Sequence, residues 1–317
     1  MKNMNTRLNR TSLAFLLSCA LVVVASCAKV EKHASFKTPQ DAVDAFVTAL
    51  QKDDTAELAK LLGPEVDDLL SSGDPVQDKA GRQNFLDLYN AKHSLSEEAD
   101  GSMVLVVGDD DWPFPIPIVE HKGKWRLDGQ AGADELIYRR VGANELGAIA
   151  VCRGVVDAQK EYASEGRDGD PAGIYALKLM SDEGMHNGLY WPTEEGEEPS
   201  PAGPFLASAT EQGYSFGGGR VPYHGYYYRL LYAQGPNAQG GARDYFTDGL
   251  MTQGFALVAW PADYGASGVQ TFIVSQDGVV YQKDLGEDTA SAVEAIETFD
   301  PDASWTAVTD AETTPEA

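Results

Sequence analysis

The spacing of apolar residues switches from helical to strand-like twice along this chain, and this order constrains the fold most. Helical spacing covers residues 36–91, and β-branched runs follow over 103–127. A long helical pattern then covers 144–163 and is followed by strand-like segments. Those segments are Tyr226–Tyr232, Phe255–Trp260, Gln270–Ser275 and Val279–Lys283. Helices that precede antiparallel strands predict an α+β fold in both halves.

Residues 36–143 form the first expected domain. Its first helix is marked by Thr38 as N-cap, Pro39 at the first helical position and Asp41 as the capping-box partner. This helix start and the layout after it resemble the cystatin-like and nuclear-transport-factor-like cone folds over about a hundred residues. The resemblance implies helices packed on one face of a curved antiparallel sheet.

Further elements of this domain follow from local signals. We expect a second helix after Asp54 and a third over 78–91, each with apolar residues at helical spacing. Residues 103–107 read as a strand, and His121-Lys122-Gly123 reads as the turn of a hairpin.

Residues 144–305 form the second expected domain. Asn144 can cap the long helix, and its Asn-Glu start and Ala158-Gln159…Tyr162 end resemble the globular part of a pilin helix. The strands after it are similar to those of pseudopilins. A pilin needs an apolar N-terminal helix that continues directly into this one, so the resemblance implies a pilin-like domain and not a fibre subunit. After Trp305, residues 306–317 are polar and expected to be disordered.

The N-terminus carries an export signal. Basic residues precede an uncharged stretch from Leu13 to Val24, which is shorter than a membrane-spanning helix. Ala25-Ser26-Cys27 then fits a bacterial lipoprotein signal, with residues 1–26 removed, Cys27 lipidated and 27–35 acting as a tether. Ala28 after the cysteine predicts the periplasmic face of the outer membrane. The alternative is an ordinary secretory signal cleaved near the same place.

Charge and cysteine content exclude several classes of function. Lys and Arg total 24 against 49 Asp and Glu, a net charge of −25, which repels nucleic acids and anionic lipids. We therefore expect no nucleic-acid partner and membrane contact only through the lipid anchor. Cys152 is the one cysteine outside the signal and the lipid site, so no intramolecular disulfide forms. The five His lack the spacing of zinc ligands.

Several motifs together resemble a family of bacterial exported proteins known only as a domain of unknown function. They are Asp109–Pro115, Tyr223–Arg229, Gly240–Tyr245, Phe255–Pro261 and Phe299–Trp305. The resemblance covers essentially the whole mature chain and implies export, but it carries no catalytic or binding residue.

An unusual aromatic and charged composition marks one candidate binding surface. Its residues are Tyr223, His224, Tyr226, Tyr228, Arg229, Arg243, Asp244 and Tyr245. Aromatic rings can stack on the sugar rings of peptidoglycan or polysaccharide, and Arg and Asp can add directional hydrogen bonds. The alternative is that these tyrosines reflect strand propensity and pack in the protein core.

Two acidic turns are candidates for calcium. Asp168-Gly169-Asp170 places two carboxylates around a glycine, but it lacks the closing glutamate of an EF-hand loop, and Pro171 interrupts it. Asp109–Asp111 is the second acidic cluster. Solvated turn charges are the favoured explanation of both, and no other cofactor is expected.

No catalytic constellation is evident. Cys152 lies on an apolar helical stripe, where a free thiol packs as a small hydrophobe. His224 and Asp244 could form an acid/base pair, but no nucleophile accompanies them. Gly217–Gly219 precedes no helix and reads as a flexible turn, not as a phosphate loop. The sequence thus favours a non-enzymatic binding or assembly module that engages an envelope protein; a cell-wall glycan-binding protein is the alternative, and a hydrolase comes third.

Overall fold

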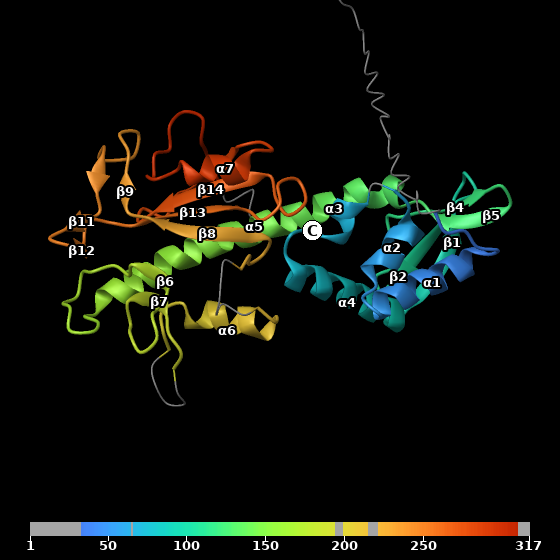
Figure 1. Cartoon of the computed structure of the whole chain (residues 1–317), viewed down its shortest axis with the longest axis horizontal. Coiled ribbons are helices and arrows are strands. Elements are labelled where there is room, and N and C mark those ends of the chain that lie inside the picture. The colour runs from blue at the N-terminus through green and yellow to red at the C-terminus, as the bar shows by residue number, and fades with distance from the viewer. Residues whose placement is uncertain (1–32, 65, 194–198, 215–220, 310–317) are drawn as a thin grey trace, which may run out of the picture. The chain divides into compact units, whose positions relative to one another are not determined.

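The computed structural model describes residues 33–64, 66–193, 199–214 and 221–309 and confirms the predicted α+β class (Figure 1). The predicted signal, Cys27 and Gly217–Gly219 lie outside the described residues. Within the described ranges, no helix is both long and apolar enough to cross a membrane.

Four helices open the amino-terminal region, which we define as residues 33–127. They are α1 (Pro39–Gln51), α2 (Thr55–Leu62), α3 (Asp67–Leu70) and α4 (Pro75–Ala91). The predicted capping box is present, because Thr38 accepts from the Asp41 amide and Asp41 accepts from the Thr38 amide. The third predicted helix, α4, begins at Pro75 and not at residue 78, because Asp74 caps it.

The sheet of this region is antiparallel, in the order β1-β2-β4-β5, with β3 paired to β2. Its strands are β1 (His93–Glu97), β2 (Met103–Val107), β3 (Trp112–Pro113), β4 (Ile118–His121) and β5 (Lys124–Leu127). The predicted hairpin is confirmed, since His121 pairs with Lys124. Helices α1 and α4 contact the sheet, and their apolar faces form one core with it.

Helix α5 (Gly129–Ser164) has 36 residues and begins earlier than the predicted start at Asn144. Asp128 accepts from the Ala131 amide and caps the helix. The added turns approach the amino-terminal region so closely that a Cβ on Gly132 would lie 2.5 Å from the Pro115 carbonyl oxygen. The predicted domain boundary between residues 143 and 144 therefore falls inside a continuous helix.

The second large sheet is antiparallel in the order β16-β15-β14-β13-β8, and we call it the carboxy-terminal sheet. Its strands are β8 (Tyr226–Leu231), β13 (Ala256–Pro261), β14 (Gln270–Ser275), β15 (Val280–Asp284) and β16 (Thr306–Ala307). All four predicted strands are confirmed within one residue. Helix α5 lies along this sheet against β13, β14 and β15, and α7 (Thr289–Glu294) contacts β13 (Figure 1).

Shorter elements complete the chain. They are the parallel pair β6 (Lys178–Met180) and β7 (Gly188–Tyr190), helix α6 (Gly203–Glu211), and the antiparallel pairs β9 (Ala233–Gln234) with β10 (Arg243–Asp244) and β11 (Phe246–Thr247) with β12 (Leu250–Met251). The tail expected to be disordered begins with β16, which pairs with β15; residues 310–317 lie outside the described ranges.

Candidate functional site

A cavity of about 750 Å³ is lined by the amino-terminal region and by the first half of α5. Its floor is formed by apolar side chains that are themselves buried. They are Phe46, Leu50, Leu58, Leu62, Val107, Phe114 and Ile116. The rings of Phe46, Phe85 and Phe114 lie within 4.9–5.7 Å of one another, so much of this floor is aromatic.

Exposed residues, three of them polar, surround the mouth of the cavity. Gly81 and Asn84 of α4, Asp110 of the β2–β3 turn, and Arg139 and Ala143 of α5 are exposed and line it. The volume is within the range of small-molecule sites, which are mostly apolar with a few polar groups. The cavity is therefore built like a binding site that opens to solvent on its polar side.

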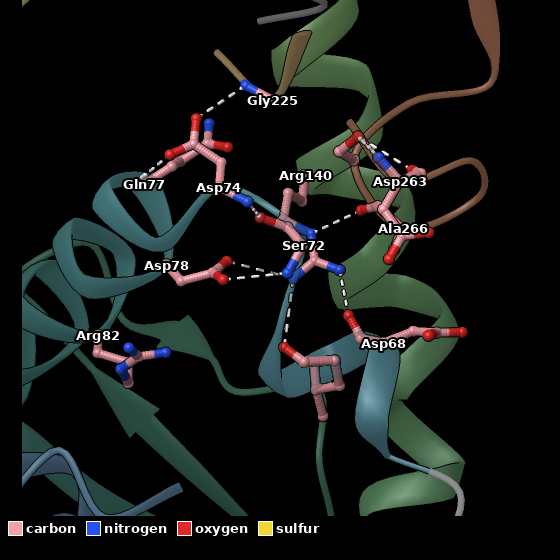
Figure 2. A network of polar contacts seen from close by, with 12 residues as sticks. Asp68, Ser72, Asp74, Gln77, Asp78, Arg82, Arg140, Gly225, Asp263 and Ala266 are labelled. Atoms are coloured by element: carbon pink, nitrogen blue, oxygen red, sulfur yellow. Dashed lines mark hydrogen bonds and ion pairs between the residues drawn. The ribbon is translucent and has the colours of Figure 1, made fainter. Parts of the chain in front are cut away.

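Arg140 holds one wall of this cavity in place (Figure 2). Its guanidinium donates to the carbonyls of Asp68 and Leu69 in α3 and, at 2.9 Å, to the carbonyl of Ala266 in the β13–β14 connection. Burial lowers the pKa of Arg140, and the nearby carboxylates of Asp78 and Asp68 oppose that shift. One side chain thus fixes α3, whose Leu69 and Leu70 line the cavity, to the carboxy-terminal part of the chain.

Asp74 is the centre of a second buried group of hydrogen bonds (Figure 2). The residue is 1% exposed, and its carboxylate accepts from the Gln77 amide, the Tyr214 hydroxyl at 2.8 Å and the Gly225 amide at 3.0 Å. Burial, and then the hydrogen bond to Asp74, raise the pKa of Tyr214 far above its usual value. Asp74 therefore caps α4 and satisfies two donors from a distant part of the chain.

Gln77 connects the cavity wall to the same distant part. Its side-chain nitrogen Nε2 donates to Asn144 Oδ1, and Asn144 Nδ2 donates to the Ser267 carbonyl at 2.8 Å. The carbonyl can only accept, so this chain of bonds fixes the orientation of both amides. Gln77 and Arg140, which both line the cavity, are thus bound to the connection that contains Ala266 and Ser267.

The cavity lining is mainly apolar. Its described residues include two carboxylates, Asp78 and Asp110, and no Ser, Thr, Cys, His, Lys or Tyr. Its arginines already have acidic neighbours, and Asp78 accepts from the Ser72 amide. The surface that the cavity presents to a ligand is therefore mainly apolar.

The structure places most of the predicted aromatic surface in the interior. Tyr226 and Tyr245 are completely buried, and the Tyr228 hydroxyl donates to the Tyr223 carbonyl. Arg229 donates to the carbonyls of Val293 and Ile296. These tyrosines follow the core-packing alternative, and a glycan could not stack on Tyr226 or Tyr245 in the folded protein.

The remaining residues of that set lie in two places. Tyr223 and His224 are partly buried beside Tyr214, with the Tyr223 ring 5.0 Å from it, so they adjoin the Asp74 group. Arg243 and Asp244 are exposed on β10, where Arg243 donates to Gln234 and Asp244 accepts from the Phe246 amide. The eight predicted residues therefore do not form one surface.

In the acidic turn proposed for calcium, the Asp168 carboxylate contacts His186. Asp168 accepts from the His186 amide at 2.7 Å, and its other oxygen lies 3.2 Å from His186 Nδ1. Asp170 is exposed. In the part of the chain that the structure describes, no three His, Cys, Asp or Glu side chains are grouped to hold a metal ion. The geometry thus gives the calcium hypothesis no support.

Cys152 is completely buried, as its place on the apolar stripe predicts. Burial raises the pKa of its thiol to about 12, so the thiol stays protonated and unreactive near neutral pH.

In the second acidic cluster, Asp109–Asp111, the Asp111 carboxylate pairs with the Lys92 ammonium at 2.7 Å.

The sequence did not predict the cavity. Phe46 and Leu50 were correctly expected on an apolar helix face, but such a pattern does not distinguish a filled core from a hollow one. The adjacent pair Arg139-Arg140 lies in the early turns of α5, where the sequence pattern did not predict a helix.

The fold and the cavity define an α+β protein with a binding-sized space in its first half. The chain belongs to the family described as "Protein of unknown function (DUF2950)", which matches residues 33–308. No curated protein and no solved structure matches it.

Proposed function

We propose that this protein is a non-enzymatic binding module whose ligand is a small, mainly apolar molecule held in the cavity of the amino-terminal region. The observation that carries the proposal is the cavity itself, about 750 Å³ with an apolar floor and a polar mouth. Burial of apolar ligand surface supplies about 25 cal/mol per Å², which drives binding without any strong polar contact.

A substitution at Gly81 tests this directly. Gly81 lines the mouth of the cavity on α4, and a Cβ added there meets no atom within 4 Å. In Gly81→Phe the new ring can enter the open space without a clash at its base. Gly142 of α5 is the matched control, because its Cβ would also be free but Gly142 does not line the cavity.

The measurement is binding of the neutral apolar dye Nile red to the purified protein. We expect Gly81→Phe to weaken binding by about tenfold or more, equivalent to about 1.4 kcal/mol, and Gly142→Phe to bind like the wild type. Melting curves of both variants show whether they remain folded. Equal dye binding by all three proteins would refute the cavity as the binding site.

We further propose that the protein acts in the bacterial cell envelope as a lipoprotein, with Cys27 as its lipid-bearing residue. The support is the sequence pattern before Cys27. Intact mass of the protein purified from membranes tests it: the expected result is a diacylglyceryl-modified Cys27 as first residue. An unmodified N-terminus at or near Ala28 would favour the ordinary secretory signal.

Engagement of an envelope protein partner, and the cone-like and pilin-like subdomains, stay predictions.

A further inference from the structure

The charges around the cavity are unevenly compensated. Three arginines line the cavity, and each has an acidic neighbour. The pairs are Arg82 with Asp53 at 2.7 Å, Arg139 with Glu135 at 2.6 Å, and Arg140 with Asp78 at 4.0 Å. Arg139 also lies 5.5 Å from the Trp112 ring. Each arginine charge therefore lies near a carboxylate, which weakens its attraction for a ligand anion.

Two polar side chains at the mouth have no such partner. Asp110 and Asn84 are exposed and line the cavity, and neither side chain has a hydrogen-bond or ion-pair partner among the described residues. Asp109, next to Asp110, is also exposed. The mouth thus presents a free carboxylate and a free amide to an arriving molecule.

The floor constrains the other end of the ligand. Phe46, Phe114 and Ile116 offer no hydrogen-bond partner, and placing an ionised group among them costs several kcal/mol. A polar head group is therefore held at the mouth, beside Asp110 and Asn84, while the apolar body fills the interior.

We propose that the cavity selects amphipathic ligands whose head group donates hydrogen bonds and carries no negative charge, such as an alcohol or an amine, and rejects the corresponding acids. This inference rests on the proposed binding function. An ammonium or hydroxyl group can donate to the Asp110 carboxylate and to the Asn84 amide oxygen. A carboxylate meets like charge at Asp110 on a chain of net charge −25.

Three probes with the same apolar chain test the selection: decylamine, decanol and decanoate. The amine and the acid are used below their critical micelle concentrations and decanol below its solubility limit, all near neutral pH. They compete with Nile red on the wild-type protein. The expected order of affinity is decylamine, then decanol, then decanoate. The preference for the amine over the acid should fall as salt is added, because the mouth is exposed to solvent.

Asp110→Asn assigns the effect to one side chain. It should reduce the preference of decylamine over decanoate by up to about 25-fold. A unit charge near 4 Å in water contributes on the order of 1 kcal/mol, about fivefold, to the attraction of the amine, and about the same to the repulsion of the acid. Asp109→Asn is the matched control, because it removes the same charge at a residue that does not line the cavity, and we expect a smaller change.

The outcomes separate this inference from the proposed function. Decanoate binding as tightly as decanol and decylamine, with all three lost in Gly81→Phe, would overturn the head-group selection and leave the cavity as a binding site. Failure of all three probes to displace the dye, with the dye unaffected by Gly81→Phe, would overturn both.

Discussion

The carboxy-terminal sheet and the amino-terminal region both pack helices against an antiparallel sheet, but they fill their interiors differently. Every residue of β13 is buried, and five of the six residues of β14 are buried. Around the cavity, helices α1 to α5 and the end of β2 instead leave about 750 Å³ open. A filled core serves stability, and space left in a core costs stability, so the cavity is where a function is expected.

Truncation of one phenylalanine in each region should give the largest difference in unfolding free energy between the two regions. Phe272 of β14 is completely buried and packs against Tyr226, and Phe272→Ala should lose about 3–5 kcal/mol of unfolding free energy. Phe114→Ala should lose clearly less, because one side of Phe114 already borders open space. Urea unfolding measures both, and equal losses would show that the cavity is collapsed or filled in solution.

The second comparison is between two helix caps. Asp74→Ala removes the cap of α4 and leaves the buried donors of Tyr214 and Gly225 unsatisfied, with an expected loss of about 2–4 kcal/mol. Thr38→Ala removes an exposed cap of the same kind and should lose only about 1 kcal/mol. If the two losses in urea unfolding are the same, the contacts of Asp74 across the chain do not hold in solution.

Helix glycines provide a smaller effect whose sign depends on the surroundings. Gly81→Ala and Gly142→Ala should each raise the unfolding free energy by about 0.5–1 kcal/mol, because both positions are helical and open. Gly132→Ala should lower it, since its Cβ would meet the Pro115 backbone. A gain in stability for Gly132→Ala would show that α5 and the amino-terminal region do not approach as closely as described.

The smallest expected effect is the pH dependence from His224. Burial lowers the pKa of His224 below its usual 6.5, with the Asp74 charge opposing the shift. The fold therefore prefers the neutral ring, and this contribution to stability is present above the unfolded pKa and is lost as pH falls through the lower folded value. His224→Asn suits the positive φ of 51° and should melt with a weaker dependence on pH between about 7 and 5. An unchanged dependence on pH would contradict this role.

Local signals predicted much of the fold. The cap at Thr38 and the strand pattern of 270–275 each depend on a few neighbouring residues, and both are present as expected. The start of α5 was missed because residues 129–143 include three glycines, which are poor helix formers. Tertiary contacts, such as that of Gly132 with Pro115, hold these turns.

The candidate site could not be predicted from the sequence for a different reason. Asp74 and Gly225 are 151 residues apart in the chain, and no local pattern connects them. The tyrosine-rich segment drew attention because of its composition, but Tyr226 is buried in a strand. Composition identifies unusual residues, whereas a cavity depends on which surfaces come together.

The bonds of Arg140 and Asn144 have a consequence for biosynthesis. Ala266 and Ser267, which accept from them, follow 126 and 123 residues later in the chain. A chain is made from its N-terminus, and its domains generally fold in that order. The helices and sheet around the cavity are therefore complete while the residues that anchor its wall are still to be added. A nascent or truncated chain that ends before residue 266 has an apolar cavity with a loose wall, which makes it a target for chaperones and proteases until residues 266 and 267 are added.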